Sequence, residues 1–264
     1  MNRYPAITAA ICTWIAASSM TQACAAQIVF VGCPILRNTA LPCWLGEDHG
    51  ELYYLGPQGD LTAKFYPPEF QHKMLVEGEI SDAPRICGGI VLKPVKVSVL
   101  PDLDVTCNVT LPAAGFADPP NNRGPGPSGA RGTAPKPPPR PEPVVYTAPF
   151  IVRNFDVRFN ADSERLWMEA QSAIEAAAHY ADVAEARRID ITGYRAVTRL
   201  SNGQNYVERA DMAKRRAEAV EQALRTLGVP VKTRLTIGWR AGAVPSSALK
   251  PGPDGRRVSL TVVP

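Results

Sequence analysis

The 264-residue sequence predicts a mixed α+β protein with a small all-β domain, a linker and a C-terminal α/β domain. Three observations predict this organisation. Short β-branched runs between turn residues fill 26–112, proline and glycine dominate 113–149, and strand-like and helix-like patterns alternate over 150–264. The length allows two small domains, and 45% hydrophobic residues is typical of a globular protein.

Residues 1–25 predict a cleaved signal peptide. A single arginine precedes an apolar run over residues 7–18, and the small-residue site Ala23-Cys24-Ala25 follows. A membrane anchor is disfavoured because the run is too short to cross a bilayer core of about 30 Å. Lipidation at the cysteine is another alternative, but Gln22 fits poorly where lipoprotein signals carry a small residue. The mature protein is expected in the periplasm or at the outer membrane.

The predicted all-β domain, 26–112, holds every cysteine of the mature chain. Its expected strands are Gln27–Val31, Glu51–Leu55, Lys73–Ile80, Ile90–Leu100 and Val105–Leu111. No long helical period interrupts them, so the domain is expected to be a five-stranded barrel or a sandwich. With fewer than about 90 residues its core is thin, which favours disulfide staples.

Cys33, Cys43, Cys87 and Cys107 predict two disulfides, because an even number of cysteines lies in one small exported domain. Their spacings lack the close pairs of a zinc site, so no metal is expected. Three pairings are possible. The shortest loops favour Cys33–Cys43 with Cys87–Cys107.

Residues 113–149 are too rich in proline and glycine to bury a core and predict an extended linker. A proline-rich ligand is the alternative, but the domains that bind such ligands are mostly cytosolic. The domains on either side are therefore expected to move independently.

The predicted C-terminal domain, 150–264, alternates strands and helices in the order βαβαββ. Strands are expected over 150–159, 188–192, 234–239 and 257–263, and helices over 163–181 and 208–227. Ser163 is expected to cap the first helix, Gly193 to end the second strand and Gly228 to stop the second helix. Right-handed crossovers would place the helices on one face of the sheet. Trp239 is expected to end its strand in the core.

Charge divides along the same borders. Residues 26–112 carry 6 basic and 10 acidic side chains, whereas residues 150–264 carry 18 basic and 13 acidic ones. A basic domain suits an anionic partner, and the expected compartment excludes nucleic acid. The three histidines lack metal-ligand spacing, and no nucleophile–base pattern occurs. Neither catalysis nor a cofactor is expected.

The C-terminal domain resembles the OmpA-like, peptidoglycan-associated family. The matching segments are Phe155–Phe159 for the opening strand, Gly193–Ala196 for a G-H-T-D element, Arg209–Ala217 for an N-x-x-L-S-x-x-R-A helix, Leu227–Val229, and Gly255–Val258 for N-R-R-V. Their order and spacing carry the resemblance, which implies an α/β sandwich that binds peptidoglycan.

In that family, the Asp of G-H-T-D and the Arg of the helix hold the zwitterionic end of diaminopimelate. Here Arg216 matches the Arg, but Ala196 stands in place of the Asp. Glu208, Asp211 and Asp190 are the candidate substitute acids. Asp190 lies on a predicted strand and is expected to have a structural role instead. The resemblance implies ligand-binding residues among Arg216, Asp211, Arg209 and Arg195.

The resemblance thus implies a non-enzymatic envelope protein that associates with peptidoglycan. The alternative is an interaction module that keeps the fold without peptidoglycan binding. On the first hypothesis, Arg216→Ala should abolish binding to sacculi and Ala196→Asp should strengthen it. The partner of the all-β domain, expected to be another envelope protein, is not indicated by the sequence.

Overall fold

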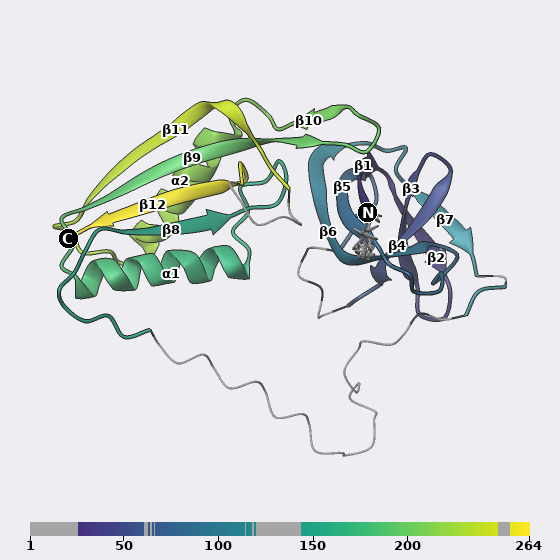
Figure 1. Ribbon diagram of the computed structural model, residues 1–264, viewed down its shortest axis with the longest axis horizontal. Helices are drawn as coiled ribbons and strands as arrows, with labels where there is room; N and C mark the ends of the chain where they lie inside the picture. Colours follow the sequence, from purple (N-terminus) through teal and green to yellow (C-terminus); the bar gives the residue numbers. More distant parts are fainter. Residues whose placement is uncertain are drawn as a thin grey trace, which may run out of the picture.

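The computed structural model describes residues 26–60, 63, 65, 67–113, 115–117, 119, 144–247 and 254–264. It contains one sheet in each predicted domain, and the two domains lie side by side (Figure 1). The predicted α+β class is confirmed. The expected signal peptide and most of the expected linker lie outside the described residues.

The N-terminal sheet has seven strands. They are β1 (Gln27–Gly32), β2 (Pro34–Asn38), β3 (Cys43–Asp48), β4 (Glu51–Pro57), β5 (His72–Ile80), β6 (Ile90–Leu103) and β7 (Val109–Pro112). Their order is β1-β5-β6-β4-β3-β2-β7, which curves into a half-barrel. Strands β2 and β3 were not expected, because prolines and a glycine break the alternation there. Pairing with neighbouring strands, rather than local pattern, makes these segments extended.

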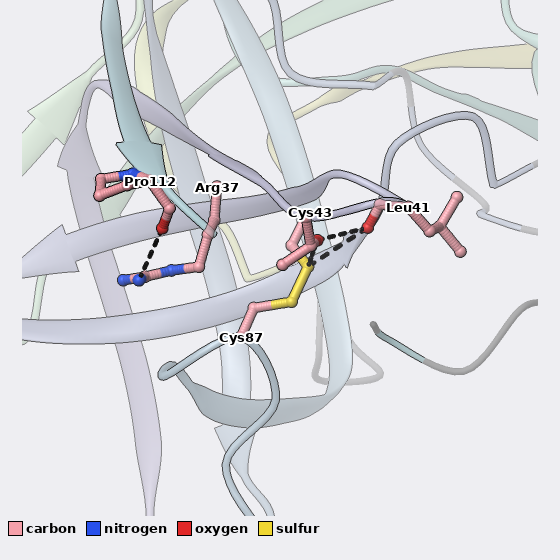
Figure 2. The surroundings of a disulfide bond; sticks show 6 residues. Arg37, Leu41, Cys43, Cys87 and Pro112 are labelled. Carbon is pink, nitrogen blue, oxygen red and sulfur yellow. Dashed lines mark hydrogen bonds between the residues drawn. A yellow bond between two sulfur atoms is a disulfide. The ribbon is translucent and has the colours of Figure 1, made fainter. Parts of the chain in front are cut away.

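The disulfides join Cys33 to Cys107 and Cys43 to Cys87, so the expected pairing is wrong. Two bridges are present, as the cysteine count predicts. The short-loop argument failed because strand pairing, not sequence distance, sets which cysteines meet. Figure 2 shows Cys43 on β3 bonded to Cys87, which lies in the turn before β6.

The described residues of the C-terminal domain form two helices and five strands. They are β8 (Arg153–Arg158), α1 (Met168–Val183), β9 (Arg188–Arg199), β10 (Asn205–Val207), α2 (Met212–Thr226), β11 (Arg234–Pro245) and β12 (Arg257–Val263). The sheet order is β10-β9-β12-β8, and β11 pairs with β9 in parallel. Both helices and the sheet contribute to one apolar core. The predicted βαβαββ order is confirmed, with β10 added to it.

Several local expectations in this domain were wrong. Helix α1 begins at Met168 and has no side-chain cap, and the Ser163 hydroxyl accepts from the Arg165 amide in the preceding loop. Strand β9 continues past Gly193 to Arg199 and forms a hairpin with β10. A Cβ at residue 193 would lie 2.0 Å from the Ala213 carbonyl oxygen, so the glycine lets α2 approach the sheet. Trp239 lies within β11 and is 48% exposed, not in the core.

The two domains contact one another, so the expected independence is wrong. The Ser201 amide donates to the Val29 carbonyl oxygen at 2.8 Å, and the Val29 amide donates to the Ser201 hydroxyl at 2.8 Å. These bonds attach the β9–β10 turn to β1, an edge strand of the other sheet. Glu77 and Arg256 form an ion pair between the domains, and each is 1% exposed. Burial, the largest single effect, lowers the pKa of Arg256, but the charge and hydrogen bond of Glu77, together with the charges of Glu208 and Asp254, keep that pKa raised.

These contacts predict that the domains stay together when the linker is cut. Trypsin is expected to cleave after Arg123 or Arg131, since Lys136 and Arg140 precede prolines. No disulfide crosses the linker. The two fragments should nevertheless co-elute in gel filtration at physiological salt. Two separately eluting fragments would show that the interdomain contacts are too weak to hold the domains.

Candidate functional site

Arg216 lies on the buried face of α2. It follows Ala213 by three residues and precedes Val220 by four, a spacing that places all three on one side of a helix. The side chain is fully buried, at 0% exposure. A buried guanidinium requires an anionic partner and acceptors for its five N–H groups.

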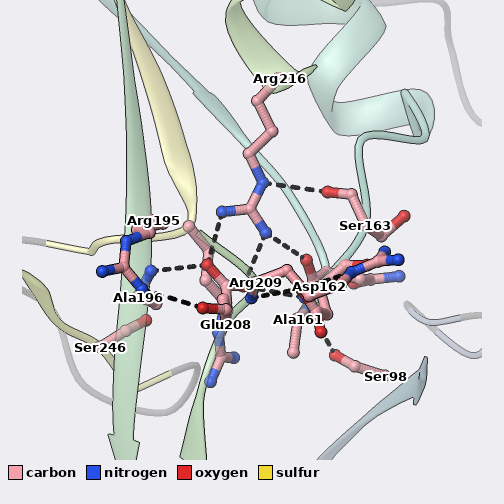
Figure 3. Close-up of polar contacts among 12 residues, drawn as sticks. Ser98, Ala161, Asp162, Ser163, Arg195, Ala196, Glu208, Arg209, Arg216 and Ser246 are labelled. Carbon is pink, nitrogen blue, oxygen red and sulfur yellow. Dashed lines mark hydrogen bonds and ion pairs between the residues drawn. The ribbon is translucent and has the colours of Figure 1, made fainter. Parts of the chain in front are cut away.

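Each of these five N–H groups donates a hydrogen bond to an oxygen atom of the protein (Figure 3). Nε donates to the Ser163 carbonyl at 3.0 Å. Nη1 donates to the Tyr194 carbonyl at 3.2 Å and to Glu208 Oε2 at 2.8 Å. Nη2 donates to the Asn160 carbonyl at 2.9 Å and to Glu208 Oε1 at 2.7 Å. The guanidinium and the carboxylate therefore form a bidentate ion pair, and no N–H group of Arg216 is left to bind a ligand.

The Glu208 carboxylate is equally well satisfied. Besides Arg216, its Oε1 accepts from the Asp162 amide at 2.8 Å and its Oε2 accepts from the Ala196 amide at 2.6 Å. The residue is 2% exposed. Good geometry and full hydrogen bonding are the conditions under which a buried ion pair is tolerated. We call this unit the Arg216–Glu208 pair.

Glu208 is thus the acid that meets Arg216, although Ala196 occupies the position of the family's Asp. It comes from the segment between β10 and α2, and its own amide donates to the Ala196 carbonyl oxygen at 3.1 Å. The other two candidate acids lie elsewhere. Asp211 is exposed and lies 3.9 Å from Arg215, and Asp190 pairs with Arg188 at 3.0 Å. A pattern search for an acid within the G-H-T-D segment could not have found Glu208.

Arg195 and Arg209, two other expected ligand residues, donate hydrogen bonds to groups around this site. Arg195 donates from Nη1 to the Glu208 carbonyl at 3.0 Å and from Nε to the Ala241 carbonyl at 2.9 Å. Arg209 Nε lies 3.4 Å from Asp162 Oδ1, and its Nη2 donates to the Asp162 carbonyl at 3.3 Å. Both arginines therefore support neighbouring backbone, while part of the Arg209 side chain remains exposed.

Asp162 is the second buried acid of the site, at 4% exposure. Its Oδ1 accepts from the Arg209 amide at 3.0 Å, and its Oδ2 accepts from the Tyr206 hydroxyl at 2.9 Å. Burial raises the pKa of Tyr206, and the charge of Asp162 raises it further. Tyr206 thus remains a neutral donor, and Asp162 holds both flanks of Glu208 in place.

A groove of about 400 Å³ opens beside this site, between the two domains. Its lining residues are Glu69, His72, Val99, Leu100, Pro101, Asp162, Ser163, Glu164, Arg165, Arg209 and Arg215. The Arg209 and Arg215 side chains are 34% and 39% exposed. Of the expected ligand residues, the structure places Arg209 at the groove, Asp211 on the surface and Arg216 in the interior. Arg195 is half-buried beside Glu208.

Two absences in the described part of the chain bear on the kind of site. Over those residues, no group of three or more His, Cys, Asp or Glu side chains lies close enough to hold a metal ion. Within the same residues, no helix combines the length and apolarity needed to cross a membrane.

The fold and the buried arginine define the class: an α/β sandwich domain whose second helix carries an internal arginine, joined to a disulfide-stapled half-barrel. The model of the OmpA family matches residues 158–256. The C-terminal domain is therefore an OmpA-like domain, as the sequence motifs predict.

Three solved structures are similar to this domain. The OmpA-like domain of FopA1 from Francisella tularensis subsp. tularensis SCHU S4 is 20% identical, with 43% of this chain and 73% of that chain covered and a TM-score of 0.32. The peptidoglycan-associated lipoprotein from Burkholderia pseudomallei is 24% identical, with 41% and 89% covered and a TM-score of 0.30. A periplasmic domain of Helicobacter pylori MotB is 18% identical, with 42% and 81% covered and a TM-score of 0.30. A search of curated proteins found no match.

The Ala196→Asp substitution is expected to destabilise the protein, and not to strengthen ligand binding. Ala196 is 0% exposed and its amide already binds Glu208, so a second carboxylate would share that buried site. We expect a loss of about 2–4 kcal/mol in the free energy of unfolding, measured by urea denaturation at pH 7. Ala241→Asp, on exposed β11, is the control and should change little. Unchanged stability of Ala196→Asp would show that the pocket has room for a further acid.

Proposed function

We propose that this chain is a non-enzymatic cell-envelope protein whose OmpA-like domain serves as an interaction module and does not hold a stem peptide at Arg216. The supporting observation is that Glu208 and three carbonyl groups accept all five N–H groups of a fully buried Arg216. A ligand carboxylate would have to displace Glu208. It would then leave a buried carboxylate without its cation, which costs about 3–5 kcal/mol.

The envelope location is supported by the chemistry of the half-barrel as well as by the expected signal peptide. Two disulfides close a domain of fewer than 90 residues. Such bridges persist in oxidising compartments and are rare in the cytosol. The proposal therefore places both domains on the exported side of the inner membrane.

Sedimentation of the mature chain with purified sacculi tests the proposal. We expect the sedimented fraction to equal that of a control without sacculi. An OmpA-like domain with both the Asp and the Arg provides the positive control. Saturable sedimentation that free diaminopimelate competes away would contradict the proposal, because it would require Arg216 to accept an external carboxylate.

A second candidate function is peptidoglycan association through the interdomain groove. The observation that favours it is the pair of partly exposed arginines, Arg209 and Arg215, on the groove wall. On this hypothesis, the mature chain sediments with sacculi without competition by diaminopimelate. The double variant Arg209→Gln/Arg215→Gln then loses sedimentation, whereas Arg187→Gln/Arg234→Gln, which removes two exposed arginines outside the groove, retains it.

A further inference from the structure

The interface between the domains is built from three kinds of contact. An apolar cluster joins Val29, Leu75 and Leu100 of the half-barrel to Ala161, with Leu200 and Tyr206 packed against it. The backbone of β1 bonds to Ser201, and the Glu77–Arg256 ion pair is closed off from solvent. The part of the OmpA-like domain in this contact, Ala161, Leu200, Ser201, Tyr206 and Arg256, is called here the docking surface.

The docking surface adjoins the Arg216–Glu208 pair through one short loop. The Ala161 amide donates to the Ser98 hydroxyl of the half-barrel at 3.1 Å, and both residues are buried. The residues on either side of Ala161 contact the pair. Asn160 and Ser163 accept from Arg216, and the Asp162 amide donates to Glu208. The half-barrel therefore holds the middle of the loop whose other groups satisfy the pair (Figure 3).

A second connection runs through the β9–β10 hairpin. Leu200, Ser201 and Tyr206 of this hairpin meet the half-barrel, and Glu208 follows it directly in the chain. Tyr206 also donates to Asp162. Both segments that position Glu208 are thus in contact with the other domain.

We infer that the half-barrel is the resident partner of the docking surface. Its docking keeps the Arg216–Glu208 pair closed, which means that the two side chains stay hydrogen-bonded to each other and inaccessible to a ligand. The inference rests in part on the proposed function, since it concerns the same pair. Docking and closure are coupled through the 160–163 loop and the hairpin. Because such coupling is reciprocal, an external carboxylate that reached Arg216 would weaken docking by the same factor by which undocking favours its entry.

Charge also suits this partner. The half-barrel domain carries 10 acidic against 6 basic residues, and the OmpA-like domain carries 18 basic against 13 acidic. Opposite net charges attract the domains at the separations that the linker allows. The buried Glu77–Arg256 pair then fixes the register of contact, because a shift in register would separate two charges that are each buried from solvent.

Hydrogen exchange of the full mature chain tests this inference. The amides of Asp162 and Ala196 both donate to Glu208, so their exchange rates report on closure of the pair. The variant Glu77→Gln/Ser98→Ala/Leu200→Asp removes the ion pair and the Ser98–Ala161 hydrogen bond and places a charge in the apolar cluster. In this variant we expect both amides to exchange at least tenfold faster. Amides of the β12 core, such as Leu260, should keep their rates. Glu79→Gln on the same strand β5 is the matched control.

Three outcomes would overturn the inference. Linker-cleaved fragments of the triple variant that still co-elute would show that the docking surface is assigned wrongly. Fragments that separate without faster exchange at Asp162 and Ala196 would show that closure is independent of docking. Equal acceleration throughout the domain would show that docking supports the whole fold and not the pair. Sacculus binding at Arg216 by the wild-type chain would contradict the proposed function alone, since the exchange result does not depend on it.

Discussion

Replacing Glu208 with alanine is expected to lower the free energy of unfolding by about 3–5 kcal/mol. The substitution leaves the Arg216 guanidinium buried with two of its N–H groups unsatisfied, together with the Asp162 and Ala196 amides. Urea denaturation at pH 7, followed by circular dichroism of the two helices, measures the effect. This loss is several times that of a surface ion pair, because solvent cannot replace the missing carboxylate.

Two comparisons make the Glu208 result specific. Glu221→Ala removes a partly exposed partner of Arg225 on the same helix and should cost only about 0.3–0.5 kcal/mol. The double variant Glu208→Leu/Arg216→Met removes both charges and should recover part of the loss, because no buried charge is then left unpaired. A single Glu208→Ala variant as stable as the Glu221→Ala variant would contradict the closed pair described above.

Reduction of the two disulfides is expected to remove about 4 kcal/mol of stability per bridge in the chain-entropy account. The bridged cysteines are 74 and 44 residues apart, so each bridge restrains a long loop of the unfolded half-barrel. A domain of fewer than 90 residues has a small free energy of unfolding, so the half-barrel should unfold at room temperature once both bridges are reduced. Loss of near-ultraviolet ellipticity from Trp44 and its neighbour Phe70 would follow this event.

The OmpA-like domain provides the internal control for reduction, because it contains no cysteine. Its helical signal should survive, although loss of the half-barrel also removes the docking partner. Thiol-reactive mass labelling under denaturing conditions should add no label before reduction and four labels to the mature chain afterwards. Any label before reduction, or an unchanged half-barrel after it, would contradict the expected result.

Much of the OmpA-like domain was predictable from sequence because its signals are local. Helix α2 carries Ala213, Ala217, Val220 and Leu224 at helical spacing, and all four are buried, whereas Leu227, expected on the same face, is 48% exposed just after the helix ends. Gly228 follows the end of α2 with a φ of 76°, as a stop signal should. The same spacing places Arg216 on the buried face, so its burial was implicit in the pattern. Local periodicity predicts which face of a helix or strand is buried, but not which residues pack against that face.

Contacts between residues far apart in the chain were decided only by the tertiary structure. The disulfide pairing followed strand order in the half-barrel, not loop length. Glu208 met Arg216 from a segment outside the one that matches G-H-T-D, and Glu77 met Arg256 across 179 residues. By itself, the sequence determined the two helices and most of the strands, though not β2, β3 or β10, together with the count of bridges and the arginine that needs a partner. It left the choice of partner open, because many acids and cysteines satisfy the same local rules and only packing selects among them.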